Sequence, residues 1–167
     1  MTSIPHPQVT DEPALRRRSF LGTLGAAGAG FLILPSGSRA QGASPNGKLN
    51  IALIGTWGRG LAHTGFLQQE NVVALCDVDE NHLAEATQKF PTAKTYHDWR
   101  KCLDQKDINA VVICTADHTH AHISTWAMNR GMHVYCEKPL ANSVEEARMV
   151  RETYLKHRGK VATQVGT

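Results

Sequence analysis

The sequence lacks several features that would assign it to a specialised class of protein. Its four cysteines (Cys76, Cys102, Cys114 and Cys136) form no CxxC pair, so they indicate neither a zinc site nor a thioredoxin-like motif. Three of them end apolar runs, which is typical of small buried hydrophobes. There is no internal repeat, and the net charge is only +3 over 167 residues. The basic residues between 148 and 160 fit a solvated helix face, so we expect no nucleic-acid partner.

The sequence also has no apolar run of the roughly 20 residues that a membrane-spanning helix needs. The apolar run over residues 21–34 is short and rich in glycine, and it follows the basic segment Leu15–Arg18. The small-residue site Ser38-Arg39-Ala40 comes soon afterwards. This order of basic, apolar and small-residue segments is that of a secretory signal.

The basic segment contains Arg17-Arg18-Ser19-Phe20-Leu21, which resembles the twin-arginine export motif. We therefore expect a signal peptide over residues 1–40, cleaved after Ala40, and a polar linker over residues 41–47. The twin-arginine translocase would be a partner, and the product would be periplasmic or otherwise exported. An uncleaved N-terminal anchor and a chance basic run are the alternatives.

Beyond the linker, residues 48–167 alternate between short apolar runs and longer amphipathic segments. Such alternation predicts an α/β fold, with a doubly wound parallel sheet and helices on both faces, as in a Rossmann dinucleotide-binding domain. Asp79, Asp98 and Ser143 are the predicted helix caps, and Ser143 with Glu146 forms a capping-box pattern. The predicted strands cover residues 49–54, 72–76, 94–96, 110–114, 133–136 and 160–165, and the helices 59–69, 80–90, 99–103, 118–130 and 144–157.

The turn after the first strand resembles the dinucleotide-binding fingerprint G-x-G-x-x-G. It reads Gly55-x-Trp57-x-x-Gly60, so Trp57 stands at the second glycine position and Gly58 follows it. The helix that begins there offers free N–H groups to a phosphate. We expect the indole either to lean away from a pyrophosphate or to crowd it, with Gly58 taking over the close approach. A glycine-rich turn without a ligand is the alternative.

An acidic residue follows the second strand at the spacing expected for a ribose ligand. Asp77 lies 22 residues after Gly55, close to the roughly 20 of the fingerprint. Its carboxylate would accept hydrogen bonds from ribose hydroxyls and repel a 2′-phosphate, so NAD is favoured and NADP is less favoured. The alternative is that Asp77 caps the next helix, although Asp79 suits that role better.

Further polar residues follow the fourth and fifth strands, namely Thr115 to His122 and Glu137-Lys138-Pro139. Three histidines at alternate positions raise the question of a metal site. On a helix His118 and His122 share a face, while His120 points elsewhere. No partner carboxylate pattern accompanies them, so we predict no metal.

These strand-end residues resemble the N-terminal domain of the Gfo/Idh/MocA family, named for glucose–fructose oxidoreductase and inositol dehydrogenase. The resemblance covers about Leu49 to Thr167. Its most specific part is Gly131–Ala141, GMHVYCEKPLA, which is similar to the family's G-x-H-V-x-x-E-K-P-x-A signature. Thr115–His120 resembles T-P-[ND]-x-x-H with Ala116 in place of proline. The family's G-R-G-x-x-H form of the glycine loop is matched by Gly55, Gly58, Arg59, Gly60 and His63.

The resemblance implies roles for individual residues. Lys138 would lie near the nicotinamide and the substrate and act in catalysis, and Glu137 and Pro139 would shape the nicotinamide pocket. Asp117 and His120 would lie along the dinucleotide groove. The candidate catalytic residues are Lys138 and Glu137, and the candidate cofactor-binding residues are Gly55, Trp57, Gly58, Arg59, Gly60, Asp77, Thr115, Asp117, His120, Glu137, Lys138 and Pro139.

The resemblance also implies a function. We expect an exported NAD-dependent oxidoreductase that acts on a sugar or polyol by hydride transfer. An NAD-dependent glycoside hydrolase of the same family and an inactive dinucleotide-binding fragment are the alternatives. Family members carry a C-terminal α/β domain that supplies the substrate wall and the oligomer interface. That domain is absent from this sequence, which we interpret as a truncated or partial family member, so a homo-oligomer is expected only where the domain is present.

Overall fold

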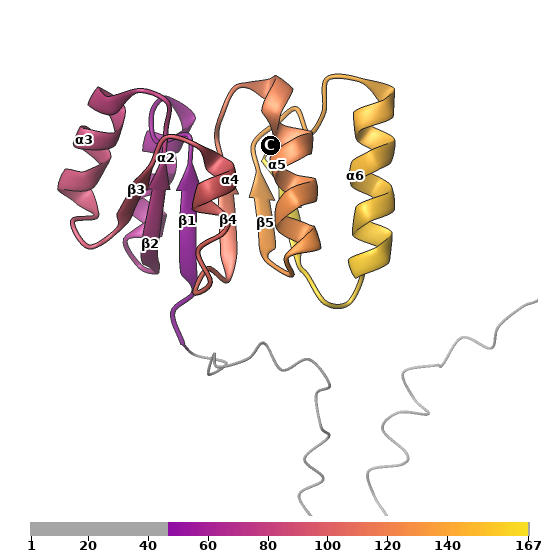
Figure 1. Ribbon diagram of the computed structural model, residues 1–167, viewed down its shortest axis with the longest axis horizontal. Helices are drawn as coiled ribbons and strands as arrows, with labels where there is room; N and C mark the ends of the chain where they lie inside the picture. The colour runs from indigo at the N-terminus through magenta and orange to yellow at the C-terminus, as the bar shows by residue number, and fades with distance from the viewer. Residues whose placement is uncertain (1–46, 167) are drawn as a thin grey trace, which may run out of the picture. The chain divides into compact units, whose positions relative to one another are not determined.

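The computed structural model of the protein describes residues 47–166, and the predicted signal peptide and cleavage site lie outside this range. Strands and helices alternate along the described chain (Figure 1). The strands are β1 (Asn50–Ile54), β2 (Asn71–Cys76), β3 (Lys94–Tyr96), β4 (Ala110–Ile113), β5 (His133–Cys136) and β6 (Thr163–Val165). The helices are α2 (Arg59–Leu67), α3 (Glu80–Lys89), α4 (Trp99–Cys102), α5 (Asp117–Asn129) and α6 (Val144–His157).

All six strands pair in parallel, in the order β3-β2-β1-β4-β5-β6. The chain therefore winds outward from β1 in one direction and from β4 in the other. The place where the order reverses, between β1 and β4, is where ligands bind in sheets of this kind. The predicted doubly wound α/β fold is confirmed.

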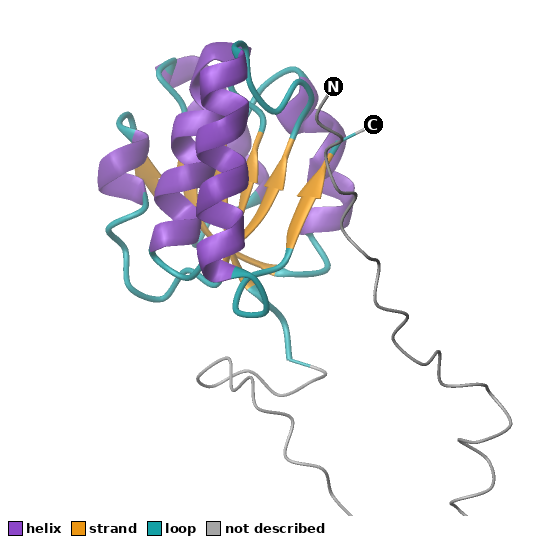
Figure 2. Cartoon of the chain, turned by 90° about the vertical axis from the view of Figure 1, so that its right-hand side faces the viewer, coloured by secondary structure: helices purple, strands orange, loops and turns teal. Residues whose placement is uncertain are grey.

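Helices cover both faces of the sheet (Figure 2), which is why the central strands are continuous apolar runs. The neighbouring residues Leu53 and Ile54 of β1 are fully buried in opposite core clusters. Leu53 shares its cluster with Leu67 of α2 and Leu83 of α3, whereas Ile54 shares its cluster with Ile123 of α5. Each such side chain contributes about 1.5–3 kcal/mol by leaving water, so β1 anchors both layers.

The predicted caps of α3 and α4 are confirmed. Asp79 accepts a hydrogen bond from the backbone N–H of Asn81 at 2.8 Å, and Asp98 accepts one from Arg100 at 2.9 Å. At α6 the Ser143 hydroxyl accepts from the Glu146 N–H at 3.1 Å, as predicted. The Glu146 carboxylate, however, accepts from the N–H of Asn142 rather than from that of Ser143 itself.

The last strand is shorter than predicted. Gly159 has a φ of +82°, and Arg158 forms an isolated bridge with Val161, so the chain turns there before β6 begins at Thr163. Within residues 47–166, no helix has the length and hydrophobicity required to cross a membrane.

Candidate functional site

The loops that follow β1, β2, β4 and β5 meet at the carboxyl edge of the sheet, the upper edge in Figure 1. Backbone hydrogen bonds tie these strand ends together. The Gly55 N–H donates to the Cys76 carbonyl at 2.8 Å, and the Glu137 N–H donates to the Ile113 carbonyl at 2.9 Å. The parallel register thus brings together residues that lie up to about 80 positions apart in the chain.

Two glycines of the first turn are required by backbone packing. Gly55 has a φ of +86°, and a Cβ on it would lie 2.5 Å from the carbonyl carbon and oxygen of Cys114. A Cβ on Gly60 would clash with the carbonyl oxygen of Gly55. Strand β1 therefore turns sharply at Gly55 against β4, and α2 begins close against that turn.

Gly58 and Trp57 leave the N-terminus of α2 accessible. Gly58 is the N-cap with a φ of 56°, and a Cβ on it would meet no atom within 4 Å. The Gly60 N–H donates to the Trp57 carbonyl at 2.9 Å. Because Gly58 has no side chain that could cap the helix, the other N–H groups of the first turn are left for an anion. The Trp57 indole turns toward α3 and stacks on His82, with ring centroids 5.0 Å apart and an interplanar angle of 14°. Although Trp57 replaces the second glycine of the usual fingerprint, a pyrophosphate could therefore still approach the backbone closely at Gly58.

The Asp77 carboxylate joins the end of β2 to the glycine turn. Its Oδ2 accepts hydrogen bonds from the backbone N–H and the hydroxyl of Thr56 at 2.8 and 3.1 Å. Its Oδ1 accepts from the Asp79 N–H at 3.1 Å, and His82 Nδ1 lies 3.7 Å from the same oxygen. Asp79 rather than Asp77 caps α3. An ionised carboxylate has about four acceptor positions, so Asp77 retains capacity for a ribose hydroxyl.

A cavity of about 330 Å³ opens between the ends of β1, β2 and β4. This volume lies within the range of about 300–1,000 Å³ that is usual for small-molecule sites. The Thr115 hydroxyl shares a hydrogen bond with the Thr119 hydroxyl at 2.6 Å beside the cavity. Asp117 is exposed in the first turn of α5 and is not among the lining residues. The cavity is lined by residues that include Gly55, Trp57, Asp77, His97, Trp99, Thr115 and His118.

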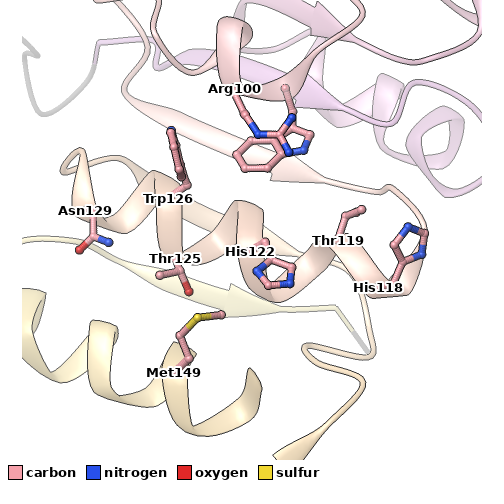
Figure 3. A pocket seen from close by; sticks show the side chains of 9 residues that line it. Arg100, His118, Thr119, His122, Thr125, Trp126, Asn129 and Met149 are labelled. Carbon is pink, nitrogen blue, oxygen red and sulfur yellow. The ribbon is translucent and has the colours of Figure 1, made fainter. Parts of the chain in front are cut away.

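A second cavity of about 530 Å³ lies beside the first along α5 (Figure 3) and shares Trp99, His118 and Thr119 with it. Trp99 and Trp126 pack edge to face with ring centroids 5.5 Å apart. The guanidinium of Arg100 lies 4.7 Å from the centre of the Trp99 ring. In this way the two indoles and the guanidinium form the wall between α4 and α5.

At the end of β5, Glu137 is buried and ionised. Its Oε1 accepts a hydrogen bond from Arg59 at 3.1 Å and lies 2.6 Å from His63 Nε2. Burial opposes ionisation, but the hydrogen bonds from His63 and Arg59 outweigh it and hold the pKa of Glu137 below its usual value. Oε2 is buried with no hydrogen-bond partner among the described residues. Arg59, predicted to bind the cofactor, thus donates one of its N–H groups to Glu137.

Lys138 and Pro139 are both exposed at the same edge. Lys138 makes no ion pair within residues 47–166. The Lys138–Pro139 peptide bond is cis. The ammonium of Lys138 is therefore available to a ligand, as the predicted role requires.

His120 was predicted to lie along the dinucleotide groove; its ring is buried with 1% of its surface exposed, and it is not among the residues that line the cavity. Nδ1 lies 2.7 Å from the Pro139 carbonyl oxygen and Nε2 lies 2.9 Å from the Thr115 carbonyl oxygen. Two carbonyls can only accept, so both bonds form when the ring is doubly protonated. The neighbouring Cys136 and the two carbonyls raise the pKa of His120 to about 9, against the opposing effect of burial. His120 thus joins the loops after β4 and β5.

The other two histidines of this segment, His118 and His122, are exposed on α5. His122 lies 3.7 Å from Glu146 of α6. Among residues 47–166, no three His, Cys, Asp or Glu side chains converge on a point that could hold a metal ion.

Sequence reasoning missed three residues of this site: Thr56, His82 and Tyr135, whose hydroxyl donates to Glu137 Oε1 at 3.4 Å. The contact of His63 with Glu137 had a signal, because His63 follows Arg59 by four positions and shares its helix face. His82 had none, because its contact with Trp57 depends on how α3 packs beside the glycine turn.

Comparison with known proteins identifies the chain's family. Residues 49–166 match the Gfo/Idh/MocA model, described as the oxidoreductase family with an NAD-binding Rossmann fold. Inositol 2-dehydrogenase of Salmonella typhimurium is 34% identical over 122 residues, covering 72% of this chain and 35% of that protein. A glycosyl hydrolase family 109 protein of Stenotrophomonas maltophilia is 34% identical over 138 residues, covering 74% of this chain and 30% of its own length.

The fold comparison agrees with the sequence comparison. The crystal structure of myo-inositol 2-dehydrogenase from Lactobacillus plantarum aligns with a TM-score of 0.67 and 29% identity, over 71% of this chain and 36% of that one. The chain thus spans about a third of the length of these relatives. The predicted cofactor, NAD, is the one named for the family's Rossmann domain. This protein belongs to the Gfo/Idh/MocA oxidoreductase family, and residues 49–166 are its NAD-binding domain.

Proposed function

We propose that residues 48–167 hold NAD for an exported oxidoreductase that acts on a sugar or polyol by hydride transfer. One observation carries the proposal. The open N-terminus of α2 at Gly58, the carboxylate of Asp77 and the Glu137–Lys138 pair all lie at one edge of the sheet. Inositol 2-dehydrogenase, named for a polyol substrate, is 34% identical to the matched part of this chain.

The residues at this edge fit NAD from one end to the other. The N–H groups at the start of α2 would bind the pyrophosphate, and Asp77 would accept from the adenosine ribose. The buried Oε2 of Glu137 lacks a partner among the described residues, and a buried acceptor ordinarily has a donor. A ribose hydroxyl or a carboxamide N–H would supply one. NAD, when bound, exchanges a hydride at its nicotinamide ring.

Lys138 would position the substrate. Its exposed ammonium donates hydrogen bonds to a substrate hydroxyl and so fixes that hydroxyl next to the nicotinamide pocket. Glu137, held by Arg59 and His63, anchors the strand end from which Lys138 projects. Lys138 is thus the proposed catalytic residue, and Glu137 shapes the pocket beside it.

Asp77 should set the choice of cofactor. We expect the full chain to bind NAD⁺ more tightly than NADP⁺ by at least about tenfold, because the carboxylate repels a 2′-phosphate. Isothermal titration calorimetry measures both affinities. The difference between the two affinities should be smaller in Asp77→Ala and unchanged in the control Asp104→Ala. The Asp104 carboxylate is 63% exposed, pairs with Arg130 and does not line the cavity. A wild-type preference for NADP⁺ would contradict the assignment.

Lys138 should control turnover rather than cofactor affinity. In the product of the complete natural reading frame, we expect Lys138→Ala to lower kcat by about 10²-fold, the size of effect that misplacing a reacting group can have. The dissociation constant for NAD⁺ should change little, because the dinucleotide is held at Gly58 and Asp77. Lys156→Ala, on the exposed side of α6, is the matched control. A normal kcat in Lys138→Ala would remove Lys138 from the mechanism.

A second candidate function is NAD-dependent glycoside hydrolysis, which the 34% identity to a glycosyl hydrolase family 109 protein favours. Two assays separate the candidates. An oxidoreductase accumulates NADH with inositols or sugars, whereas a glycosidase releases nitrophenol from nitrophenyl glycosides with no net NADH. Binding of NAD⁺ with neither activity would support the third candidate, a dinucleotide-binding protein without turnover.

A further inference from the structure

Three side chains meet beside the cavity at the end of β2. The Trp57 indole lies nearly parallel to the His82 imidazole, with 5.0 Å between ring centroids. Nδ1 of His82 lies 3.7 Å from Oδ1 of Asp77, and the two side chains are 31% and 11% exposed. The indole covers one face of the imidazole, so the stack limits the orientations in which His82 can face Asp77.

The charge of this cluster depends on a single proton. Two carboxylates face His82: Asp77 at the end of β2, and Asp79, the N-cap of the helix that carries His82. Within residues 47–166 no lysine or arginine pairs with either of them. Trp57, which packs from the glycine turn, is uncharged. An imidazole becomes a cation when it takes up a second proton. His82 holds such a ring 3.7 Å from Asp77 Oδ1, so it is the group that can neutralise Asp77.

Resting on the proposed NAD site, we propose that His82 makes the choice between NAD and NADP depend on pH. While the imidazole is neutral, Asp77 presents an uncompensated negative charge to the ribose and repels a 2′-phosphate. Once the ring is protonated, the Asp77–His82 pair carries no net charge, and the imidazolium N–H attracts the phosphate. The site therefore admits NADP at acid pH and rejects it at alkaline pH.

Calorimetric titration of the full chain with NAD⁺ and NADP⁺ between about pH 5.5 and 8.5 tests this proposal. We expect the ratio of the NADP⁺ to the NAD⁺ dissociation constant to rise about tenfold across this range, since one unit charge acts on the phosphate through a partly exposed site. The 2′-phosphate of NADP⁺ also titrates. In His82→Gln, the part of the rise in this ratio that comes from the 2′-phosphate should remain, and the part that comes from His82 should be lost.

The chain offers a matched control. His122 also lies 3.7 Å from a carboxylate, but that carboxylate is Glu146 of α6, which does not line the cavity, whereas the partner of His82, Asp77, does line it. His122→Gln should keep the full rise of the wild type. Trp57→Leu removes the stack while leaving His82 in place, and it should reduce the rise.

Two outcomes overturn the inference. A rise in His82→Gln equal to that of the wild type would transfer the effect to His97 or His118, which line the same cavity. If the ratio of the two dissociation constants in the wild type changes only as much as the titration of the 2′-phosphate predicts, His82 has no effect on the choice of cofactor. In both cases NAD⁺ still binds and the proposed function survives, whereas a chain that binds NAD⁺ at no pH would fail the proposed function itself.

Discussion

At the scale of single residues, two glycines of α2 occupy opposite environments. A Cβ on Gly60 would clash with the backbone carbonyl of Gly55, whereas a Cβ on Gly65 would meet no atom within 4 Å. Backbone atoms cannot swing aside as a flexible side chain can. Gly60 is thus required by the packing of α2 on β1, and Gly65 is not.

We therefore expect opposite effects from the same substitution. Gly60→Ala should lower the free energy of unfolding by about 1–3 kcal/mol through overpacking, and it should weaken NAD⁺ binding because α2 moves away from the turn. Gly65→Ala should raise the free energy of unfolding by about 0.5–1 kcal/mol, because alanine loses less chain entropy in a helix. Urea denaturation measures both values. Equal effects at the two positions would show that the turn relaxes to accept a side chain.

At the scale of elements, His120 connects two loops that carry the site. Its ring lies between the Thr115 carbonyl after β4 and the Pro139 carbonyl after β5. The bridge is complete only while the imidazole is doubly protonated. Loss of one proton leaves a buried ring nitrogen facing a carbonyl lone pair, which is unfavourable.

The free energy of unfolding should therefore depend on whether His120 is doubly protonated. The pKa of His120 is raised to about 9 in the folded chain, against roughly 6.5 for an unfolded histidine. The contribution to stability is therefore fully present below about pH 6.5 and is lost as the pH rises through 9, with a total of roughly 3 kcal/mol. His120→Gln should unfold more easily at pH 6 and show a flatter pH dependence in thermal melts. His157→Gln, near the C-terminal end of α6, is the control, and its melting temperature should depend on pH as in the wild type. The same pH dependence in His120→Gln would contradict the protonated bridge.

At the scale of the whole molecule, export remains a prediction from the sequence, because residues 1–46 lie outside the described structure. Replacement of both Arg17 and Arg18 by lysine should retain a reporter fusion in the cytoplasm, because the twin-arginine route requires the arginine pair. Mass spectrometry of the exported wild-type product should find Gln41 at its N-terminus. Normal export of the double variant would mean that another route carries the protein.

Local sequence features were sufficient to predict the architecture. Strand β1 is a continuous apolar run because both of its faces are buried, and Asp79 and Ser143 mark helix starts because their side chains satisfy free N–H groups. The alternation of strands and helices then implies parallel pairing, since right-handed crossovers leave few other arrangements. Gly55 and Asp77 could be placed at the carboxyl edge of the sheet from the sequence alone, because parallel strands end at a common edge.

Tertiary structure alone decided which strand-end side chains touch one another. His120 shares its segment with exposed His118 and His122, yet it is buried because α5 turns it toward the loop after β5. Arg59 and His63 reach Glu137 across 78 and 74 positions, and Trp57 meets His82 only because α3 packs beside the glycine turn. Periodicity specifies which face of an element is apolar. Contacts between distant side chains depend instead on how elements pack across the sheet, which no local pattern of residues encodes.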